Sequence, residues 1–277
     1  MFTTLIELPQ FADLLETENP LVLDCSFALG KPDWGREEYL KAHISGAIYV
    51  DLENDLSGPP ITDCGRHPMP SAEALIELFS RLGVSAGRQV LAYDQQQGAT
   101  ASRLWWLLKY MGHDAVAVLN GGMAAWRREG RRESSGEEQP IAAQFVGQAR
   151  RDRLVTIDEL DQVPVLIDAR AAKRFRGEVE PLYAIPGHIP GSKNCPYDDH
   201  IDANGQVIES SEIRAKVRKI IGDVAEADVV YSCGSGVTAC HLLLTSMYSG
   251  LAEGKVYVGS YSEWLSDPAR EIATGNE

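Results

Sequence analysis

Short runs of apolar residues recur along the chain, and each ends at a polar residue or a cysteine. Runs of four or five residues are shorter than an ordinary helix, and continuous hydrophobicity is typical of strands buried on both faces of a parallel sheet. We therefore predict four such strands, which are Leu21–Cys25 (LVLDC), Val90–Asp94 (VLAYD), Val165–Ala169 (VLIDA) and Val229–Cys233 (VVYSC).

Four segments of the first half of the chain recur in the second half, in the same order. LVLDC pairs with VLIDA and VLAYD pairs with VVYSC, while AHISGA at 42–47 pairs with GHIPGS at 187–192 and VLNGGMAAW at 118–126 pairs with VYVGSYSEW at 256–264. The offsets between partners are 144, 139, 145 and 138 residues. Similar offsets for four segments in the same order indicate a duplicated structural unit.

Helical patterns alternate with these strands. Ser71 is a good N-cap for a helix over 71–82, and Gly83 follows as its C-terminal glycine. Thr156 and Glu159 form a capping-box pattern. Apolar helices are predicted at 102–111 and 239–248. Strand–helix alternation predicts an α/β protein of two domains, each a parallel sheet with helices on both faces.

The two domains should meet in a polar stretch between Arg131 and Arg153, which has no regular apolar period. We place the boundary near residue 140, giving domains 1–140 and 141–277. The 277-residue length leaves each domain long enough for its own core.

Composition restricts the possible partners. A net charge of −14 argues against nucleic acid and anionic membrane surfaces. No apolar run approaches the roughly 18 residues of a membrane helix, and the first ten residues do not resemble a secretion signal. The five scattered cysteines include no Cys-x-x-Cys pair, which disfavours a disulfide framework and a structural zinc site. We expect a cytoplasmic protein without metal or organic cofactor.

Cys233 differs from the other cysteines in its context. It ends a predicted strand, is followed by Gly234 and Gly236, and precedes a predicted helix. Glycines allow successive N–H groups to point inward as an anion-binding nest, and the helix N-terminus adds its dipole. A thiolate or persulfide would be stabilised there, so Cys233 is the candidate nucleophile. Cys25 and Cys240 fit core positions, and Cys64 and Cys195 have no such context.

Phosphate-ester chemistry fits this loop poorly. A phosphatase loop of the Cys-x5-Arg type places an arginine at the sixth residue after the cysteine. Here that residue is Ala239, and the loop contains no arginine.

The chain resembles tandem-domain rhodanese-family sulfurtransferases over nearly its full length. The motif CGSGVT at 233–238 is similar to the active loop of the family's 3-mercaptopyruvate branch, whereas the thiosulfate branch carries Arg and Lys after the cysteine. GHIPGS at 187–192, GSYSEW at 259–264, RLWW at 103–106 and Gly121, Gly122 and Trp126 also fit the family.

The resemblance implies a set of functional residues. Cys233 would carry a persulfide held by the N–H groups of Gly234, Gly236, Val237 and Thr238, and Arg174 would bind the substrate carboxylate. Ser235, His67 and Glu53 would form a Ser–His–acid relay, with Asp51 beside Glu53, while Arg170 would be structural. The first domain would be silent, because Asp94 occupies the cysteine position and Gln95–Thr100 follows it.

One segment departs from the family pattern. The branch usually carries a second substrate arginine after a Glu-Pro, but here Glu180 and Pro181 are followed by Leu182 and Tyr183, in a segment one residue short. Carboxylate binding is then either weaker or supplied by another residue, such as Arg176.

Three functions remain open at this stage. The first is sulfur transfer from 3-mercaptopyruvate through Cys233 to an acceptor such as cyanide, a thiol or thioredoxin. The second is the same chemistry with thiosulfate as donor. The third is a non-catalytic rhodanese-like module that carries sulfur for a partner protein.

Overall fold

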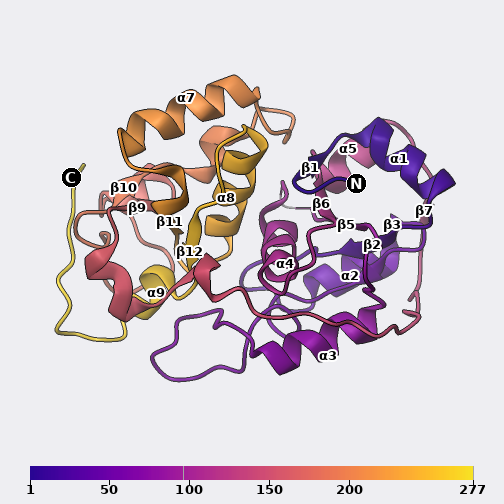
Figure 1. The fold of residues 1–277 in the computed structure, drawn as a ribbon, viewed down its shortest axis with the longest axis horizontal. Coiled ribbons are helices and arrows are strands. Elements are labelled where there is room, and N and C mark those ends of the chain that lie inside the picture. The colour runs from indigo at the N-terminus through magenta and orange to yellow at the C-terminus, as the bar shows by residue number, and fades with distance from the viewer. Residues whose placement is uncertain (96, 277) are drawn as a thin grey trace. The chain divides into compact units, whose positions relative to one another are not determined.

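The fold was analysed in a computed structural model that describes residues 1–95 and 97–276 (Figure 1). The chain forms two compact units, each treated by itself below. The first contains residues 1–58, 70–150 and 203–206, and the second contains residues 59–69, 151–202 and 207–277. Residues 141–150 join the first unit, where Phe145 packs edge-on against Phe79.

The first unit is built on a five-stranded parallel sheet of order β1-β6-β5-β2-β4. Its strands are β1 (Leu5–Ile6), β2 (Leu21–Asp24), β4 (Ile48–Tyr49), β5 (Val90–Tyr93) and β6 (Val116–Leu119). Two further short strands, β3 (His43–Ile44) and β7 (Glu133–Ser134), pair antiparallel beside it.

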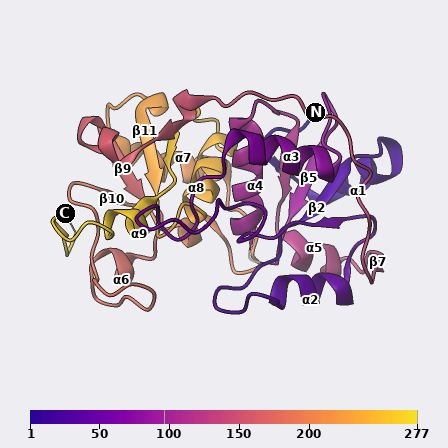
Figure 2. The ribbon, with the colours of Figure 1, turned by 90° about the horizontal axis from the view of Figure 1, so that it is seen from below.

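Helices cover both faces of this sheet. On one face α1 (Leu8–Thr17) and α5 (Gly122–Arg128) share a core with the strands, centred on Phe11, Leu91 and Trp126. Figure 2 shows α3 (Ala72–Leu82) on the side of β5 and β2 opposite to α5. The fully buried α4 (Ala99–Tyr110) packs on β5 and β6, and α2 (Trp34–Lys41) packs near β3.

The second unit repeats this design. Its parallel sheet has the order β10-β9-β11-β12-β8, with β8 (Leu154–Val155), β9 (Val165–Asp168), β10 (Lys193–Asn194), β11 (Val229–Ser232) and β12 (Lys255–Tyr257). Reading this order backwards matches the first sheet strand for strand, so the predicted duplication and the two-domain α/β fold are confirmed.

The helices of the second unit also lie on both faces. The helix α8 (Thr238–Tyr248) packs on β11 and β12 and is covered by α7 (Ser210–Ile221). On the opposite face Tyr261 and Trp264 of α9 (Ser260–Trp264) share a core with Leu166 and Val230. The short α6 (Ala172–Phe175) follows β9, and 3₁₀ turns lie at 151–153, 157–162, 197–200 and 226–228.

The predicted caps are present. The Ser71 hydroxyl accepts a hydrogen bond from the Ala74 N–H at 3.2 Å, and Gly83 ends α3 with a φ of 88°. The capping box of Thr156 also forms, but it opens a six-residue 3₁₀ helix rather than an α-helix. Pro164 follows this segment and disfavours helical geometry at the residue before it, which explains the early end.

No helix in the described part of the chain is long and apolar enough to cross a membrane.

A buried histidine makes the second unit sensitive to acid. His200 is bonded to Thr245 Oγ1 at 2.8 Å and lies 3.7 Å from the Cys195 sulfur. Burial, with a smaller contribution from His241, lowers its pKa from 6.5 to about 3. In the unfolded chain His200 therefore becomes protonated near pH 6.5, whereas in the folded chain it stays neutral down to about pH 3. The free energy of unfolding consequently decreases as the pH falls from 6.5 toward 3.

We expect this histidine to remove about 2 kcal/mol of unfolding free energy between pH 7 and pH 5, at about 1.4 kcal/mol per pH unit below 6.5. The His200→Gln variant should lose this part of the slope in urea titrations at the two pH values. An unchanged slope in that variant would show that His200 does not resist protonation.

Candidate active site

Cys233 lies directly after β11, the central strand of the second unit's sheet. Its side chain is buried, with 2% of the residue exposed. In an open parallel sheet this carboxyl end is where ligands bind. The position therefore suits a nucleophile shielded from bulk water.

The loop after Cys233 curls around the sulfur. The Gly236 N–H donates to Cys233 Sγ at 3.1 Å. Gly236 has a φ of +78°, and a Cβ there would lie 2.3 Å from the Val258 carbonyl oxygen, so only glycine fits. Helix α8 begins at Thr238, which directs its N-terminal end toward the loop. One loop amide thus donates to the sulfur, next to the N-terminal end of a helix, as an anion-binding nest requires.

A second segment holds this loop in place. The Cys233 N–H donates to the Ser260 hydroxyl at 3.0 Å, and the Tyr261 N–H donates to the Cys233 carbonyl at 3.0 Å. Ser260 adopts a φ of 54°, a costly conformation for a residue with a side chain. Cys233, the candidate nucleophile, is thus fixed by hydrogen bonds to both its N–H and its carbonyl.

Gly234 receives two further hydrogen bonds. Its carbonyl accepts from the Ser262 N–H at 2.9 Å and from the Tyr183 hydroxyl at 2.8 Å. A Cβ on Gly234 would lie 3.0 Å from that hydroxyl oxygen. Tyr183 therefore forms one wall of the loop, a role that sequence reasoning missed.

Ser235 and His67 are in direct contact. His67 Nδ1 lies 2.9 Å from Ser235 Oγ, and both residues are 3% exposed. Although 168 residues separate them in sequence, residues 59–69 belong to the same compact unit as the cysteine loop. The Arg66 guanidinium also donates to Ser235 Oγ, at 3.2 Å, a contact that sequence reasoning did not anticipate.

Glu53, the predicted acid of the relay, lies in the first unit. It is exposed, and its N–H donates to Asp51 Oδ1 at 2.9 Å. Its part in a relay remains a prediction.

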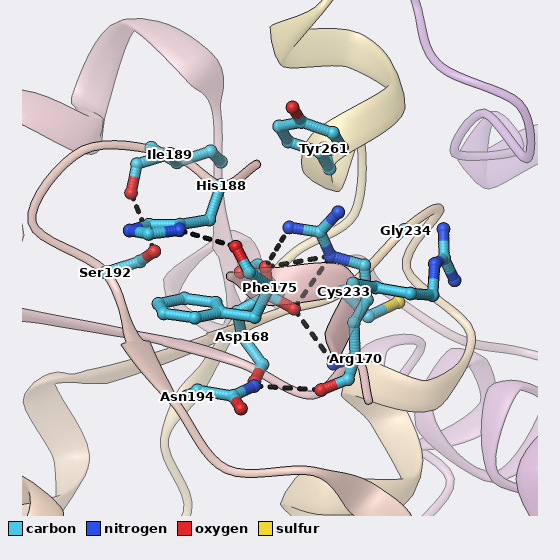
Figure 3. A network of polar contacts seen from close by, with 12 residues as sticks. Asp168, Arg170, Phe175, His188, Ile189, Ser192, Asn194, Cys233, Gly234 and Tyr261 are labelled. Carbon is cyan, nitrogen blue, oxygen red and sulfur yellow. Dashed lines mark hydrogen bonds and ion pairs between the residues drawn. The ribbon is translucent and has the colours of Figure 1, made fainter. Parts of the chain in front are cut away.

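Two arginines of the second unit are held by buried carboxylates. Arg170 makes a bidentate pair with Asp168, with Nη2 to Oδ2 at 2.6 Å and Nε to Oδ1 at 3.1 Å, and lies over the Tyr261 ring (Figure 3). Arg174 donates to Glu180 through Nη2 at 2.8 Å and Nε at 3.2 Å. Pairing of this kind fixes the orientation of a guanidinium.

The surrounding network is a rigid frame (Figure 3). His188 stacks on Phe175 with ring centroids 3.7 Å apart and bonds to its carbonyl at 2.7 Å. Asn194 donates to the carbonyls of Asp168 and Arg170 at 2.9 and 2.8 Å. Arg170 and the HIPG motif therefore belong to one network around the end of β9, and a purely structural role for Arg170 stays a prediction.

The other thiols lie in different surroundings. Burial raises the pKa of Cys195 to about 12 and that of Cys25 well above its usual value. Cys240 donates through Sγ to the Gly236 carbonyl at 3.1 Å. These environments suit inert thiols.

The first unit contains a matching loop with an internal anion. Asp94 follows β5, the central strand, and is fully buried. Its carboxylate accepts from the N–H groups of Gly98, Thr100 and Ala101 at 2.8, 2.8 and 2.9 Å. The loop residue Gln96 lies outside the described part of the chain. At the corresponding place of the first unit, the loop N–H groups therefore bind the protein's own carboxylate.

The chain matches the Rhodanese-like domain family over residues 7–129 and 154–267. It is 38% identical to the probable 3-mercaptopyruvate sulfurtransferase of Pseudomonas aeruginosa over 98% of both chains. It is 34% identical to the putative thiosulfate sulfurtransferase SseB of Mycobacterium tuberculosis, over 98% of this chain and 97% of that one. The solved 3-mercaptopyruvate sulfurtransferase of Leishmania major is similar at 32% identity, with a TM-score of 0.84 over 95% of this chain and 74% of that chain.

Proposed function

Since the chain belongs to the rhodanese family and is a sulfurtransferase, we propose that it transfers sulfur through a persulfide on Cys233. The observation that carries this proposal is the contact of the Cys233 sulfur with the Gly236 N–H at 3.1 Å, at the N-terminus of α8. Amide donors aimed at a sulfur stabilise its anionic forms, which are the thiolate before transfer and the persulfide after it.

The proposed donor is 3-mercaptopyruvate. The Cys233 thiolate attacks the donor sulfur, an S–S bond forms, and the C–S bond breaks with its electron pair leaving as pyruvate enolate, which then takes up a proton. The loop of residues 234–238 carries no cation, which suits a donor whose charge lies on a distant carboxylate better than dianionic thiosulfate.

The remaining site residues have proposed roles in this step. The N–H groups of Gly234, Gly236, Val237 and Thr238 hold the outer sulfur. Ser235 Oγ and His67 Nδ1, 2.9 Å apart, move the proton, and Glu53 is the acid proposed for this relay. Arg174, oriented by Glu180, binds the donor carboxylate with the part of its guanidinium turned away from that pair.

A thiophilic acceptor completes the cycle. Cyanide, a small thiol or thioredoxin attacks the outer sulfur, and Cys233 returns to the thiolate. The free state of all five cysteines supports a reducing compartment such as the cytoplasm. The first domain, predicted from the sequence to contain residues 1–140, is proposed to be catalytically inactive, because the Asp94 carboxylate occupies the loop where the second domain has its cysteine.

The test compares two donors. Thiocyanate formation from cyanide is measured with 3-mercaptopyruvate and with thiosulfate, for the wild type and Cys233→Ala. We expect a kcat/KM ratio of tenfold or more in favour of 3-mercaptopyruvate, and no turnover in the variant.

Two results would overturn parts of the proposal. A preference for thiosulfate would establish the second function, which the name of the mycobacterial relative favours, and would keep the nucleophile. A persulfide that forms without turnover to any free acceptor would indicate a sulfur carrier serving a partner protein.

A further inference from the structure

We propose that Tyr183 is a positioning residue for the reaction at Cys233, because its hydroxyl fixes the peptide that follows Gly234 in the orientation that an anionic sulfur needs. The proposal rests on the proposed role of Cys233 as the nucleophile and adds a residue to that site. It also gives a function to the segment 180–183, which departs from the family pattern.

The side chain of Tyr183 is anchored at the cysteine loop. Tyr183 is only partly exposed, whereas the other residues of 181–186 are exposed. Its ring meets that of Tyr261 edge-on, with centroids 5.9 Å apart, and the Arg174 guanidinium carbon lies 5.7 Å from its centroid. These contacts hold the ring in one orientation, so the position of its hydroxyl is fixed as well.

Two donors hold the Gly234 carbonyl oxygen. It accepts from the Tyr183 hydroxyl at 2.8 Å and from the Ser262 N–H at 2.9 Å, which uses both of its lone pairs. The peptide is trans, so the N–H of Ser235 points in the direction opposite to this carbonyl. A hydrogen bond to a carbonyl also polarises its peptide and strengthens the N–H as a donor. Tyr183 therefore orients and strengthens an amide of the cysteine loop.

The orientation of this carbonyl affects the charge on the sulfur. Because Cys233 is buried, water screens its sulfur little, and a carbonyl oxygen that turned toward the sulfur would repel a thiolate or a persulfide. The Tyr183 hydroxyl holds the oxygen in another direction. Burial raises the pKa of Tyr183 above its usual value near 10, so the hydroxyl keeps its proton and remains a donor at neutral pH.

The glycine at position 234 leaves the space that this hydroxyl occupies. Gly234 does not adopt a left-handed backbone conformation, so alanine is compatible with its backbone. A Cβ there would lie 3.0 Å from the Tyr183 hydroxyl oxygen and 3.6 and 3.7 Å from two carbons of the ring. These are the three nearest heavy atoms that such a Cβ would meet. The Gly234→Ala variant therefore displaces the hydroxyl and should act as Tyr183→Phe does.

The test measures the reactivity of the thiol without a sulfur donor. Iodoacetamide alkylates the Cys233 thiolate, with an S–C bond forming as iodide leaves. The rate is followed over a range of pH by mass analysis of the Cys233 peptide, for the wild type, Tyr183→Phe, Gly234→Ala and the double variant. The matched control is Tyr39→Phe, which removes a hydroxyl that donates to the Ala47 carbonyl at 2.9 Å in the first unit.

We expect Tyr183→Phe to move the midpoint of the alkylation profile upward by about half a pH unit, because the thiolate loses part of its stabilisation. Gly234→Ala should produce a similar shift, and the double variant should shift no further than the single variants. With 3-mercaptopyruvate, Tyr183→Phe should lower kcat about fivefold and change KM by less than about twofold. Tyr39→Phe should leave both the midpoint and kcat as in the wild type.

An unchanged midpoint in Tyr183→Phe would overturn the proposal, and so would shifts that add in the double variant, since they would show that the two residues act separately. Sulfur transfer at the wild-type rate in Tyr183→Phe would likewise remove the role of the hydroxyl and leave the proposed function intact. If the midpoints shift as expected but the wild type transfers no sulfur, the proposed function is wrong and the positioning of Cys233 by Tyr183 is supported.

Discussion

Replacing Cys233 with serine should abolish sulfur transfer, with a loss of roughly 10⁴-fold or more in kcat. A serine hydroxyl is far less acidic than a thiol and cannot form a persulfide, so the loop amides would have no anion to hold. Intact-mass measurement after treatment with 3-mercaptopyruvate should show one added sulfur atom in the wild type and none in Cys233→Ser.

The control for this experiment is Cys64→Ser. Cys64 is the cysteine that the structure leaves partly exposed, so it is the thiol most open to adventitious modification. We expect this variant to load sulfur and to turn over as the wild type does. If the added sulfur persists in Cys233→Ser but is absent from Cys64→Ser, Cys64 is the residue that carries it, and the proposed mechanism is wrong.

The fold and the glycine-containing turn after Cys233 could be predicted because their signals are local. The strand Val229–Ser232, Cys233, two glycines and the start of a helix lie within about a dozen positions. The offset of 139 residues from Asp94 to Cys233 is one of the similar offsets that relate the two halves of the chain. Backbone geometry follows directly from such patterns, as the +78° φ of Gly236 illustrates.

The contacts of Arg66 and Tyr183 could not be predicted in this way. Arg66 reaches Ser235 across 169 residues, and Tyr183 reaches Gly234 across 51. The segment 59–69 leaves its own half of the sequence to join the second unit, and no periodicity of side chains records that exchange. A sequence identifies the residues able to carry charge, but which of them are neutralised depends on tertiary pairing such as that of Arg174 with Glu180.

Unlike the contacts of Arg66 and Tyr183, the position of Asp94 at the end of a strand could be predicted from the sequence. The structure adds that its carboxylate holds the loop of the first unit together. Three N–H groups converge on its fully buried carboxylate. Removing the carboxylate in Asp94→Ala leaves those donors without their acceptor, at a cost of about 1–3 kcal/mol each before water enters. We therefore expect the variant to lose about 3–5 kcal/mol of unfolding free energy.

Urea denaturation at pH 7 measures this loss, with Asp13→Ala as the matched control. Asp13 is exposed on α1, so its replacement should change stability by no more than about 0.5 kcal/mol. Asp94→Asn should fall between the two, because an amide keeps one acceptor oxygen and turns an NH₂ group toward the loop donors. A loss below about 1 kcal/mol in Asp94→Ala would mean that the nest does not depend on an anion, and the same amides around Cys233 would then be a weak argument for a persulfide.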